Sequence, residues 1–446
     1  MRDARHGLTV DRSRSARAGA SQPSTRRRGN GMRILIVGAG VIGLSSAYYL
    51  HRAGHEVTVL ERHPEVARET SFANGGQLSY SYVAPLADPG VIPKLPGWLL
   101  RRDSPVRFRP TLNPAQWRWC FAFLAACTRS RSALTTRQLL SLSFLSRTLL
   151  HEMIAAEPSL DFDFVRSGKL VLHRDPGAMQ QAVAQLELQR ALGCEQQALD
   201  AAACVALEPS LAPHRARFAG GIHTPSEDTA DCHRFCTALA ALLRARGVTI
   251  TTGVAVDGLR VAGDASDARV VALRGGTPVD ADQIVIATGA RAAPLLAPLG
   301  IRPPIWPLKG YSLTYALPAG APAPRASLTD FARKIVYARL GERLRVAGIA
   351  DLDASPEPDP ARIATLHAQA RALFPELTAG EPLAWTGQRP ATPTGVPIIG
   401  PTRYRNLWLN LGHGALGFTL AAGSAALLAD WLAGGTGHPL RETFSR

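Results

Sequence analysis

The sequence lacks the features that would assign it at once to a membrane, repeat or hydrolase class. Its 446 residues contain no uninterrupted apolar run near the roughly 18 residues that a membrane-spanning helix needs. No internal repeat and no heptad run is present, which excludes solenoids and coiled coils. No Ser–His–Asp set and no metal-ligand cluster is visible, so neither a nucleophilic hydrolase nor a metal centre is indicated.

Cysteine is scarce as well, with six residues and no metal-type pairing. Cys232 and Cys236 are spaced to share one face of a helix, which indicates core packing rather than metal binding. A reduced, cytoplasmic protein fits this usage best.

Acidic residues are outnumbered, because 35 Asp and Glu stand against 50 Lys and Arg, a formal net charge of +15. Residues 1–31 carry eight Arg and two Asp without apolar periodicity, so we expect a disordered leader. Met32 is then the natural start or the leader is an inert tail, and a targeting segment is the alternative. Outside this leader no basic block suits RNA or DNA, so no nucleic-acid partner is expected.

The stretch "RILIVGAGVIGLSSAYYLHRAGHEVTVLER" runs from Arg33 to Arg62 as strand, glycine loop, helix and strand. Gly38 permits the tight turn, Gly40 lets a pyrophosphate approach the backbone, and Gly43 lets the helix pack close to the strand. Glu61 follows the second strand, where a carboxylate accepts from the adenosine ribose. The pattern predicts an adenine dinucleotide site. Its further candidate contacts are Val41, Ile42 and Arg62.

Three later stretches favour a flavin over a nicotinamide: "TSFANGGQLS" (70–79), "DQIVIATGA" (282–290) and the strand, glycine loop and helix of 406–434. The last aims a second helix N-terminus at a ligand, which suits the end of a flavin ring that becomes anionic on reduction. The sequence therefore predicts FAD. The candidate contacts in these stretches are Ser71, Asn74, Gly75, Gly76, Gln77, Thr288, Gly289, Gly412, Gly414, Leu416, Gly417, Phe418 and Thr419.

Four motifs, "TSFANGGQLSYSYVAPLADPG", "PLKGYSLT", "RPATPTGVPIIG" and "NLWLNLGHGALGFTLAAGS", together resemble the bacterial FAD-dependent D-amino acid dehydrogenases. These belong to the larger family of D-amino acid oxidase, glycine oxidase and sarcosine oxidase. The resemblance covers the chain from Met32 onward. It implies oxidative deamination of D-amino acids to 2-oxo acids and ammonia, with electrons passed to a respiratory acceptor such as a quinone.

The resemblance also bears on how the flavin is held. It places Val254 near the adenine. Some relatives attach FAD covalently through a cysteine before the C-terminal flavin motif, whereas Trp385–Gly400 contains none. A non-covalent flavin is therefore expected.

The expected fold class is α/β, with a discontinuous Rossmann-like FAD-binding domain and an α+β substrate domain that contains an antiparallel sheet. The flavin domain comprises 32–88, 220–300 and 385–446, and the substrate domain 89–219 and 301–384. Within the second insertion, "KIVYARL" and "RLRVAGIA" alternate as antiparallel strands do.

Aromatic and arginine side chains alternate between residues 98 and 123. One interpretation is a helix that is buried on one face and carries extended arginines. The other is a peripheral contact with the inner face of the cytoplasmic membrane, where rings lie at the lipid boundary and guanidinium groups meet phosphates. Nucleic acid is the least favoured partner for this segment.

Oxidation at a flavin needs a held carboxylate, a neutral amine and a Cα–H directed at flavin N5. Arg389 in "GQRPATPTG" is the candidate carboxylate anchor, a position that matches the anchor of glycine oxidase relatives. Tyr311 could donate to the same carboxylate, and Lys309 projects to the same side of its strand. Tyr82 could form the pocket wall, and His413 could tune the flavin or relay a proton.

Three alternatives stay open at this point. The protein could be an oxidase that uses O₂, a non-catalytic flavoprotein subunit of a hetero-oligomer, or a flavoprotein that acts on tRNA. The substrate could also be a cyclic imino acid. Pocket volume decides among substrates, and the sequence does not contain it.

Overall fold

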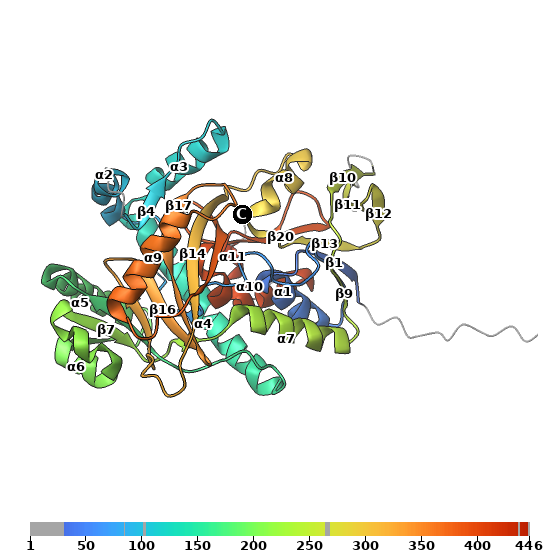
Figure 1. Ribbon diagram of the computed structural model, residues 1–446. Coiled ribbons are helices and arrows are strands. Elements are labelled where there is room, and N and C mark those ends of the chain that lie inside the picture. Colours follow the sequence, from blue (N-terminus) through green and yellow to red (C-terminus); the bar gives the residue numbers. More distant parts are fainter. Residues whose placement is uncertain (1–30, 84, 101–103, 264–267, 436–437, 445–446) are drawn as a thin grey trace, which may run out of the picture.

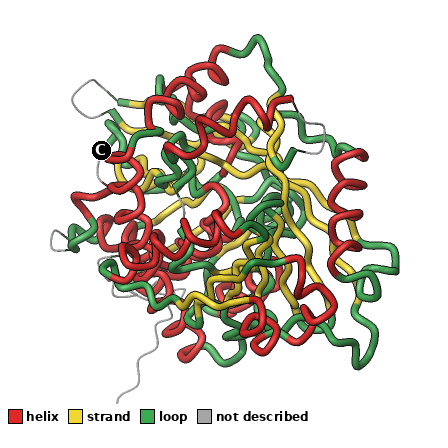
Figure 2. The backbone as a smooth tube through the Cα atoms, turned by 90° about the vertical axis from the view of Figure 1, so that its left-hand side faces the viewer, coloured by secondary structure: helices red, strands yellow, loops and turns green. Residues whose placement is uncertain are grey.

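The computed structural model describes residues 31–446 except 84, 101–103, 264–267, 436–437 and 445–446; the side chains of 94, 98–100 and 188 are not described either. Nearly all of the expected leader 1–31 thus lies outside the described residues. Two large sheets meet at an angle, and helices cover their outer sides (Figures 1 and 2). This is the expected α/β class.

The first sheet contains the glycine motif. Its neighbouring strands are parallel except at one edge, where β19 and β20 are antiparallel. Apolar runs such as "RILIV" are buried on both faces, as parallel strands require. The strand order is β19 (Ile398–Pro401), β20 (Leu407–Leu411), β13 (Gln283–Ile286), β1 (Arg33–Val37), β2 (Glu56–Leu60) and β9 (Thr249–Thr251).

Helices cover one face of this sheet, and a small antiparallel sheet covers the other. The helices are α1 (Val41–Arg52), α7 (Cys232–Ala245) and α10 (Gly417–Leu432), with α4 (Arg129–Ala156) packed on α10. The small sheet consists of β10 (Gly258–Ala262), β11 (Arg269–Arg274) and β12 (Thr277–Val279). Cys232 and Cys236 are both buried in the core on α7, which confirms their expected packing role.

The second sheet has nine strands and is mostly antiparallel. Helix α9 (Pro360–Leu373) buries Leu366, Ala370 and Leu373 against one of its faces. The strands expected from 334–340 and 343–350 are present as an antiparallel pair that spans 335–340 and 343–352. The order is β18 (Leu383–Ala391), β14 (Trp306–Ala316), β17 (Arg343–Leu352), β16 (Ile335–Leu340), β15 (Ser327–Asp330), β5 (Lys169–His173), β7 (Gly220–Thr224) and β6 (Gln197–Asp200), with β4 (Val106–Phe108) beside β17.

Two predicted domain boundaries fall inside this second sheet. Residues 220–224 were assigned to the flavin domain, yet they form β7 and pair with β5. The boundary at 385 cuts β18, which pairs with β14 along its whole length. Both segments have their hydrogen-bond partners in the substrate sheet, so the flavin-domain pieces begin after 224 and after 391.

The remaining elements lie around the two sheets. By length and composition Gly414–Leu432, which includes α10, could cross a membrane, but 72% of that window is buried against the rest of the protein. It packs as a core helix between α1 and α4. The other elements are β3 (Gln77–Leu78) paired with β8 (Asp228–Thr229), and α2 (Leu95–Leu100), α3 (Pro114–Ala126), α5 (Pro176–Arg190), α6 (Ala201–Leu207), α8 (Ala292–Leu296) and α11 (Arg441–Phe444).

Candidate active site

A cavity of about 1340 Å³ lies between the two sheets. The carboxyl ends of β1, β2, β13 and β20 meet on one side of it, where ligands bind in open parallel sheets. The faces of β14, β17 and β18 form the opposite side. Every cofactor residue expected from the sequence lines this cavity except Gly43. The stretches around 40, 75, 288 and 416 are thus brought together from distant parts of the chain.

The glycine loop shows why its three glycines differ. A Cβ on Gly43 would lie 1.9 Å from the carbonyl oxygen of Gly38, so Gly43 brings α1 against the strand and not against the ligand. Gly38 has φ +104° and its Cβ would contact Ala287 O at 2.9 Å. At Gly40 the nearest atom to a Cβ would be Ser71 Oγ at 3.4 Å, so this glycine leaves the approach to the cavity open.

Two helix N-termini border the cavity. Neither Gly40 before α1 nor Leu416 before α10 makes a side-chain capping hydrogen bond, and neither first turn holds an acidic residue. In α1 the N–H of Val41 donates to Ser71 Oγ at 3.1 Å, and the following N–H groups of the first turn point to where phosphate or ring oxygens would bind. Thr288, on the cavity wall, also has a buried Oγ1 without a partner among the described residues. These features fit FAD.

The Glu61 carboxylate is fixed by backbone donors. It accepts from Ala39 N at 2.8 Å and from His63 N at 2.9 Å while it lines the cavity. Val254 lies beside it, since Val254 N donates to Glu61 O at 2.8 Å. Burial, followed by the nearby charge of another arginine, lowers the pKa of Arg62, which pairs with Glu69 at the same end of the cavity.

The loop of residues 70–79 is held by internal and distant bonds. The Asn74 side chain accepts from Gly76 N at 3.1 Å, and Gln77 donates to Leu328 O at 3.0 Å. Arg345, 4% exposed, donates to Asn74 O at 2.7 Å. Arg345 could not be singled out from the sequence, because an arginine within a strand has no distinguishing spacing.

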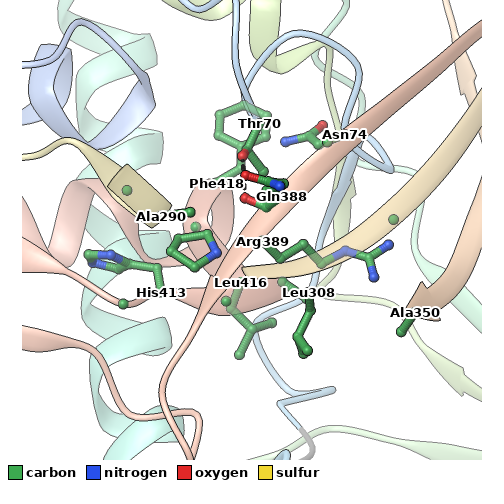
Figure 3. Close-up of a pocket in the computed structure, with 18 of the residues that line it drawn as sticks. Thr70, Asn74, Ala290, Leu308, Ala350, Gln388, Arg389, His413, Leu416 and Phe418 are labelled. Carbon is green, nitrogen blue, oxygen red and sulfur yellow. Dashed lines mark hydrogen bonds between the residues drawn. The ribbon is translucent and has the colours of Figure 1, made fainter. Parts of the chain in front are cut away.

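Arg389 lines the cavity from β18. Its Nη1 donates to Ile349 O at 3.0 Å, and its guanidinium packs on Gly310, where a Cβ would lie 2.3 Å from Nη2. Figure 3 shows the side chain passing Leu308 toward Ala350, on the side away from His413. Burial lowers the pKa of Arg389 from its ordinary value. The guanidinium nevertheless stays charged, because the ordinary pKa of arginine is very high. No carboxylate in the described part of the chain forms an ion pair with it.

Tyr311 and Lys309 point to a buried charged cluster. Tyr311 Oη donates to Asp351 at 2.9 Å, and Lys309 Nζ donates to Asp353 at 3.0 Å. Asp351 also accepts from Arg107 and Arg362. Tyr311 lines the cavity, although its proton is already committed to Asp351. Lys309 was expected at the site or its rim, and it does not line the cavity. Burial, with Asp351 next, raises the pKa of Tyr311.

His413 and Tyr82 also line the cavity. His413 is 2% exposed, its Nε2 lies 3.1 Å from Ser424 Oγ, and burial lowers its pKa to about 3. It is neutral at physiological pH, which disfavours a proton relay. Burial raises the pKa of Tyr82 to about 12. The Nζ of Lys169 lies 4.3 Å from the centre of this ring.

Comparisons with known proteins now decide the family. A family model described as FAD dependent oxidoreductase matches residues 33–431. The chain belongs to this family. FAD is accordingly its cofactor, and the protein is an enzyme of oxidoreductase type.

Named relatives of this family member are similar over almost the whole chain. A protein named D-amino acid dehydrogenase 2 from Ralstonia nicotianae is 52% identical over 414 residues, covering 90% of this chain and 96% of the relative. One of the same name from Pseudomonas aeruginosa is 50% identical, covering 89% and 94%. Glycine oxidase from Geobacillus kaustophilus shares the fold, with a TM-score of 0.72 at 22% identity over 93% of this chain and 99% of that one.

Among the charged cavity residues that sequence reasoning missed is a buried lysine of the substrate sheet. Lys169, at the start of β5, is 3% exposed, and its Nζ donates to Ser79 Oγ at 2.8 Å. Burial lowers its pKa to about 8. The buried carboxyl group of Glu227 interacts electrostatically with Lys169, and burial raises the pKa of Glu227 to about 7. The sequence pattern did not single out Lys169, because a lysine at the start of an apolar strand is usually exposed to solvent.

Proposed function

We propose that this protein oxidises D-amino acids, or related cyclic imino acids, and passes the electrons to a respiratory acceptor of the quinone class. One observation carries the proposal: the Arg389 guanidinium faces the flavin cavity without an ion-pair partner in the described residues. A substrate carboxylate satisfies such a cation with two parallel hydrogen bonds. The names of the relatives at 52% and 50% identity supply the D-amino acid class.

Bound FAD supplies the acceptor for a hydride from the substrate Cα. Arg389, fixed by Ile349 O and by its packing on Gly310, holds the carboxylate and thereby sets the direction of Cα. Loss of the Cα hydride and one N–H proton converts the neutral amine to an imine, which water hydrolyses to the 2-oxo acid and ammonia.

The surroundings of Arg389 support this role. Asp351 lies nearby, but Arg107, Arg362 and Tyr311 already occupy its oxygens, so it does not compete for the guanidinium. Leu308 and Trp119 form an apolar wall that keeps water from the reacting atoms. The Arg389 guanidinium is thus left to bind the carboxylate of an amino acid.

We further propose that the flavin is non-covalent and that the enzyme acts in the cytoplasm, at the inner face of the membrane. Six cysteines without disulfide partners suit a reducing compartment. An oxidase would use the same cavity with O₂ as the acceptor, and the rate of flavin reoxidation in air distinguishes the two.

The test is anaerobic. Protein starting at Met32 is purified, its visible spectrum is recorded, and D- and L-amino acids, glycine, sarcosine and cyclic imino acids are added in turn. We expect a yellow protein that D-substrates bleach and L-amino acids do not. Air should restore the colour slowly and a quinone quickly. A yellow protein bleached by no compound would favour a non-catalytic subunit, and fast recovery in air alone would favour an oxidase.

A further inference from the structure

The cavity contains a buried cation that the proposed mechanism does not use. Lys169 lines the cavity from the start of β5 and is 3% exposed. Its Nζ carries three donors, of which one goes to Ser79 Oγ at 2.8 Å, and it lies 4.3 Å from the centre of the Tyr82 ring. Within the part of the chain that the structure describes, no carboxylate forms an ion pair with Lys169. The remaining donors are therefore available to a ligand.

The charge of Lys169 is only partly compensated by the protein. The carboxyl group whose charge acts on it is that of Glu227, which is not part of the cavity wall. Glu227 Oε1 accepts from Ser81 N at 2.7 Å, and its buried Oε2 has no hydrogen-bond partner among the described residues. Because burial raises the pKa of Glu227, a fraction of this group is protonated at neutral pH.

Lys169 also lies close to the expected place of the flavin ring. Ser79, which accepts from Lys169, donates through its own N–H to Thr419 Oγ1 at 3.0 Å. Thr419 belongs to the first turn of α10, the helix whose N-terminus borders the cavity. Two hydrogen bonds thus connect the ammonium group with this helix end, so a ligand bound over the ring would lie near Lys169.

The distance between Lys169 and Arg389 suits two anionic groups on one short molecule. Arg389 enters from β18, but its guanidinium extends to Ile349 O on β17 and points toward Ala350 on the same strand (Figure 3). From β17 through β16 and β15 to β5 there are three strand spacings, which amount to about 14 Å. One carboxylate does not span such a gap. Two carboxylates on a short carbon chain nearly do, with an ion pair of about 2.8 Å at each end.

The wall between these two cations carries no opposing charge. Among the described residues, the strands of the nine-stranded sheet and the β15–β16 turn contribute Lys169, Lys334 and Arg389 to the cavity, but no Asp or Glu. Lys334 Nζ lies 3.8 Å from the centre of the Phe331 ring, and Phe331 packs in the same apolar cluster as Tyr82. Such a wall attracts an anionic side chain and disfavours a cationic one.

We propose that Lys169 binds a side-chain carboxylate of the substrate, so that the enzyme prefers acidic D-amino acids such as D-glutamate. This inference rests on the proposed function and adds a side-chain class to it. Arg389 holds the α-carboxylate, Lys169 holds the second carboxylate, and Cα lies between them. The second carboxylate takes no part in the bond changes: the Cα hydride still goes to the flavin, and the amine still loses one proton.

The test compares two substrates of nearly equal size, D-glutamate and D-glutamine, with the FAD-loaded protein and a water-soluble dye as electron acceptor. The proteins are the parent, Lys169→Gln, which removes the charge but keeps a polar group beside Ser79, and Arg166→Gln. Arg166 is the matched control, because it is exposed, lies three residues before Lys169 and does not line the cavity. The readout is the ratio of the two kcat/KM values, from which any general loss of rate cancels.

We expect the parent and Arg166→Gln to favour D-glutamate by at least about ten-fold, the effect of one charge-assisted hydrogen bond. In Lys169→Gln this ratio should fall by at least about ten-fold. A parent that oxidises D-glutamine as well as D-glutamate would overturn the inference, and this comparison stands even if the variant does not fold. An equal ratio in the parent and Lys169→Gln would overturn it as well.

A second measurement separates this inference from the proposed function, which fails if no D-amino acid bleaches the parent. Glutarate, a dicarboxylate without an amine, is titrated into each protein, and its Kd is obtained from the change in the flavin spectrum. The Kd should rise by at least about ten-fold in Lys169→Gln and stay unchanged in Arg166→Gln. Equal Kd values in the parent and Lys169→Gln would refute the Lys169 site, whatever the outcome with amino acids.

Discussion

Replacement of Arg389 by Met should reduce D-amino acid oxidation without loss of the flavin. The parent guanidinium makes one backbone bond, to Ile349 O, and offers its remaining N–H groups to the cavity. Hydrogen bonds to charged groups contribute about 1.5–3 kcal/mol each, so two bonds to a carboxylate amount to about 3–5 kcal/mol after partial desolvation. At 1.4 kcal/mol per factor of ten, kcat/KM should fall roughly 100- to 3000-fold.

The assay is stopped-flow bleaching of the flavin under anaerobic conditions, as a function of D-alanine concentration. Arg389→Lys keeps the charge but loses the planar fork, so its kcat/KM should lie between those of the parent and Met variants. Arg339→Met is the matched control, because Arg339 is exposed on the same sheet. FAD content should equal that of the parent in all three variants. The reasoning fails if Arg389→Met keeps the parent's half-saturation and rate, or if Arg339→Met shows the same loss.

Four further substitutions test separate features of the site. Gly310→Ala should displace the Arg389 guanidinium, because the added Cβ would lie 2.3 Å from Nη2. We expect kcat/KM to fall roughly 10- to 100-fold at unchanged FAD content. An unchanged kcat/KM would refute the packing of the Arg389 guanidinium on Gly310. Gly40→Ala should fold but bind FAD more weakly. Gly43→Ala should lower the melting temperature of the apoprotein, because its Cβ would lie 1.9 Å from a backbone oxygen, whereas a Cβ on Gly40 meets no backbone atom. Equal melting temperatures of the two apoprotein variants would contradict this. Burial lowers the pKa of His413 from 6.5 to about 3. Between pH 6.5 and pH 3 the imidazole is therefore protonated in the unfolded chain but neutral in the folded protein. The free energy of unfolding falls as the pH is lowered through this range, by up to about 1.4 kcal/mol per pH unit. His413→Gln should lose less melting temperature between pH 7 and 5 than the parent does, and an equal loss would contradict the shift.

The nucleotide half of the site could be predicted from the sequence because its determinants are local. The glycines, the helix and the acidic residue of 33–62 act on a ligand within one strand–helix–strand unit. Likewise the turn after β20 and the N-terminus of α10 are adjacent in sequence. Both units line the cavity as the pattern indicated.

The substrate half depended on strand pairing across long separations, which spacing does not encode. Lys309 and Tyr311 both donate from β14 to the cluster of Asp351 and Asp353, and of the two only Tyr311 also lines the cavity. Lys169 enters the cavity from β5 because β5 pairs with β15, over 150 residues later. The domain boundaries failed for the same reason, since β7 and β18 are fixed by partners distant in sequence.

The position of Arg389 shows how one register decides the chemistry. Leu308 is opposite Arg389, and Gly310 is opposite Gly387, in the β14–β18 pairing, and all four residues line the cavity. Because side chains alternate between the two faces of a sheet, a shift of one residue would turn Arg389 toward the opposite face. Gly310 also leaves room for the guanidinium, which a side chain there would displace, whereas a Cβ on Gly387 would meet the Trp385 ring. "KGY" and "GQRP" carry no signal as isolated tripeptide and tetrapeptide patterns. Once they are paired, they place the Arg389 guanidinium beside the flavin cavity without an ion-pair partner among the described residues, and the carboxylate of an amino acid fits it.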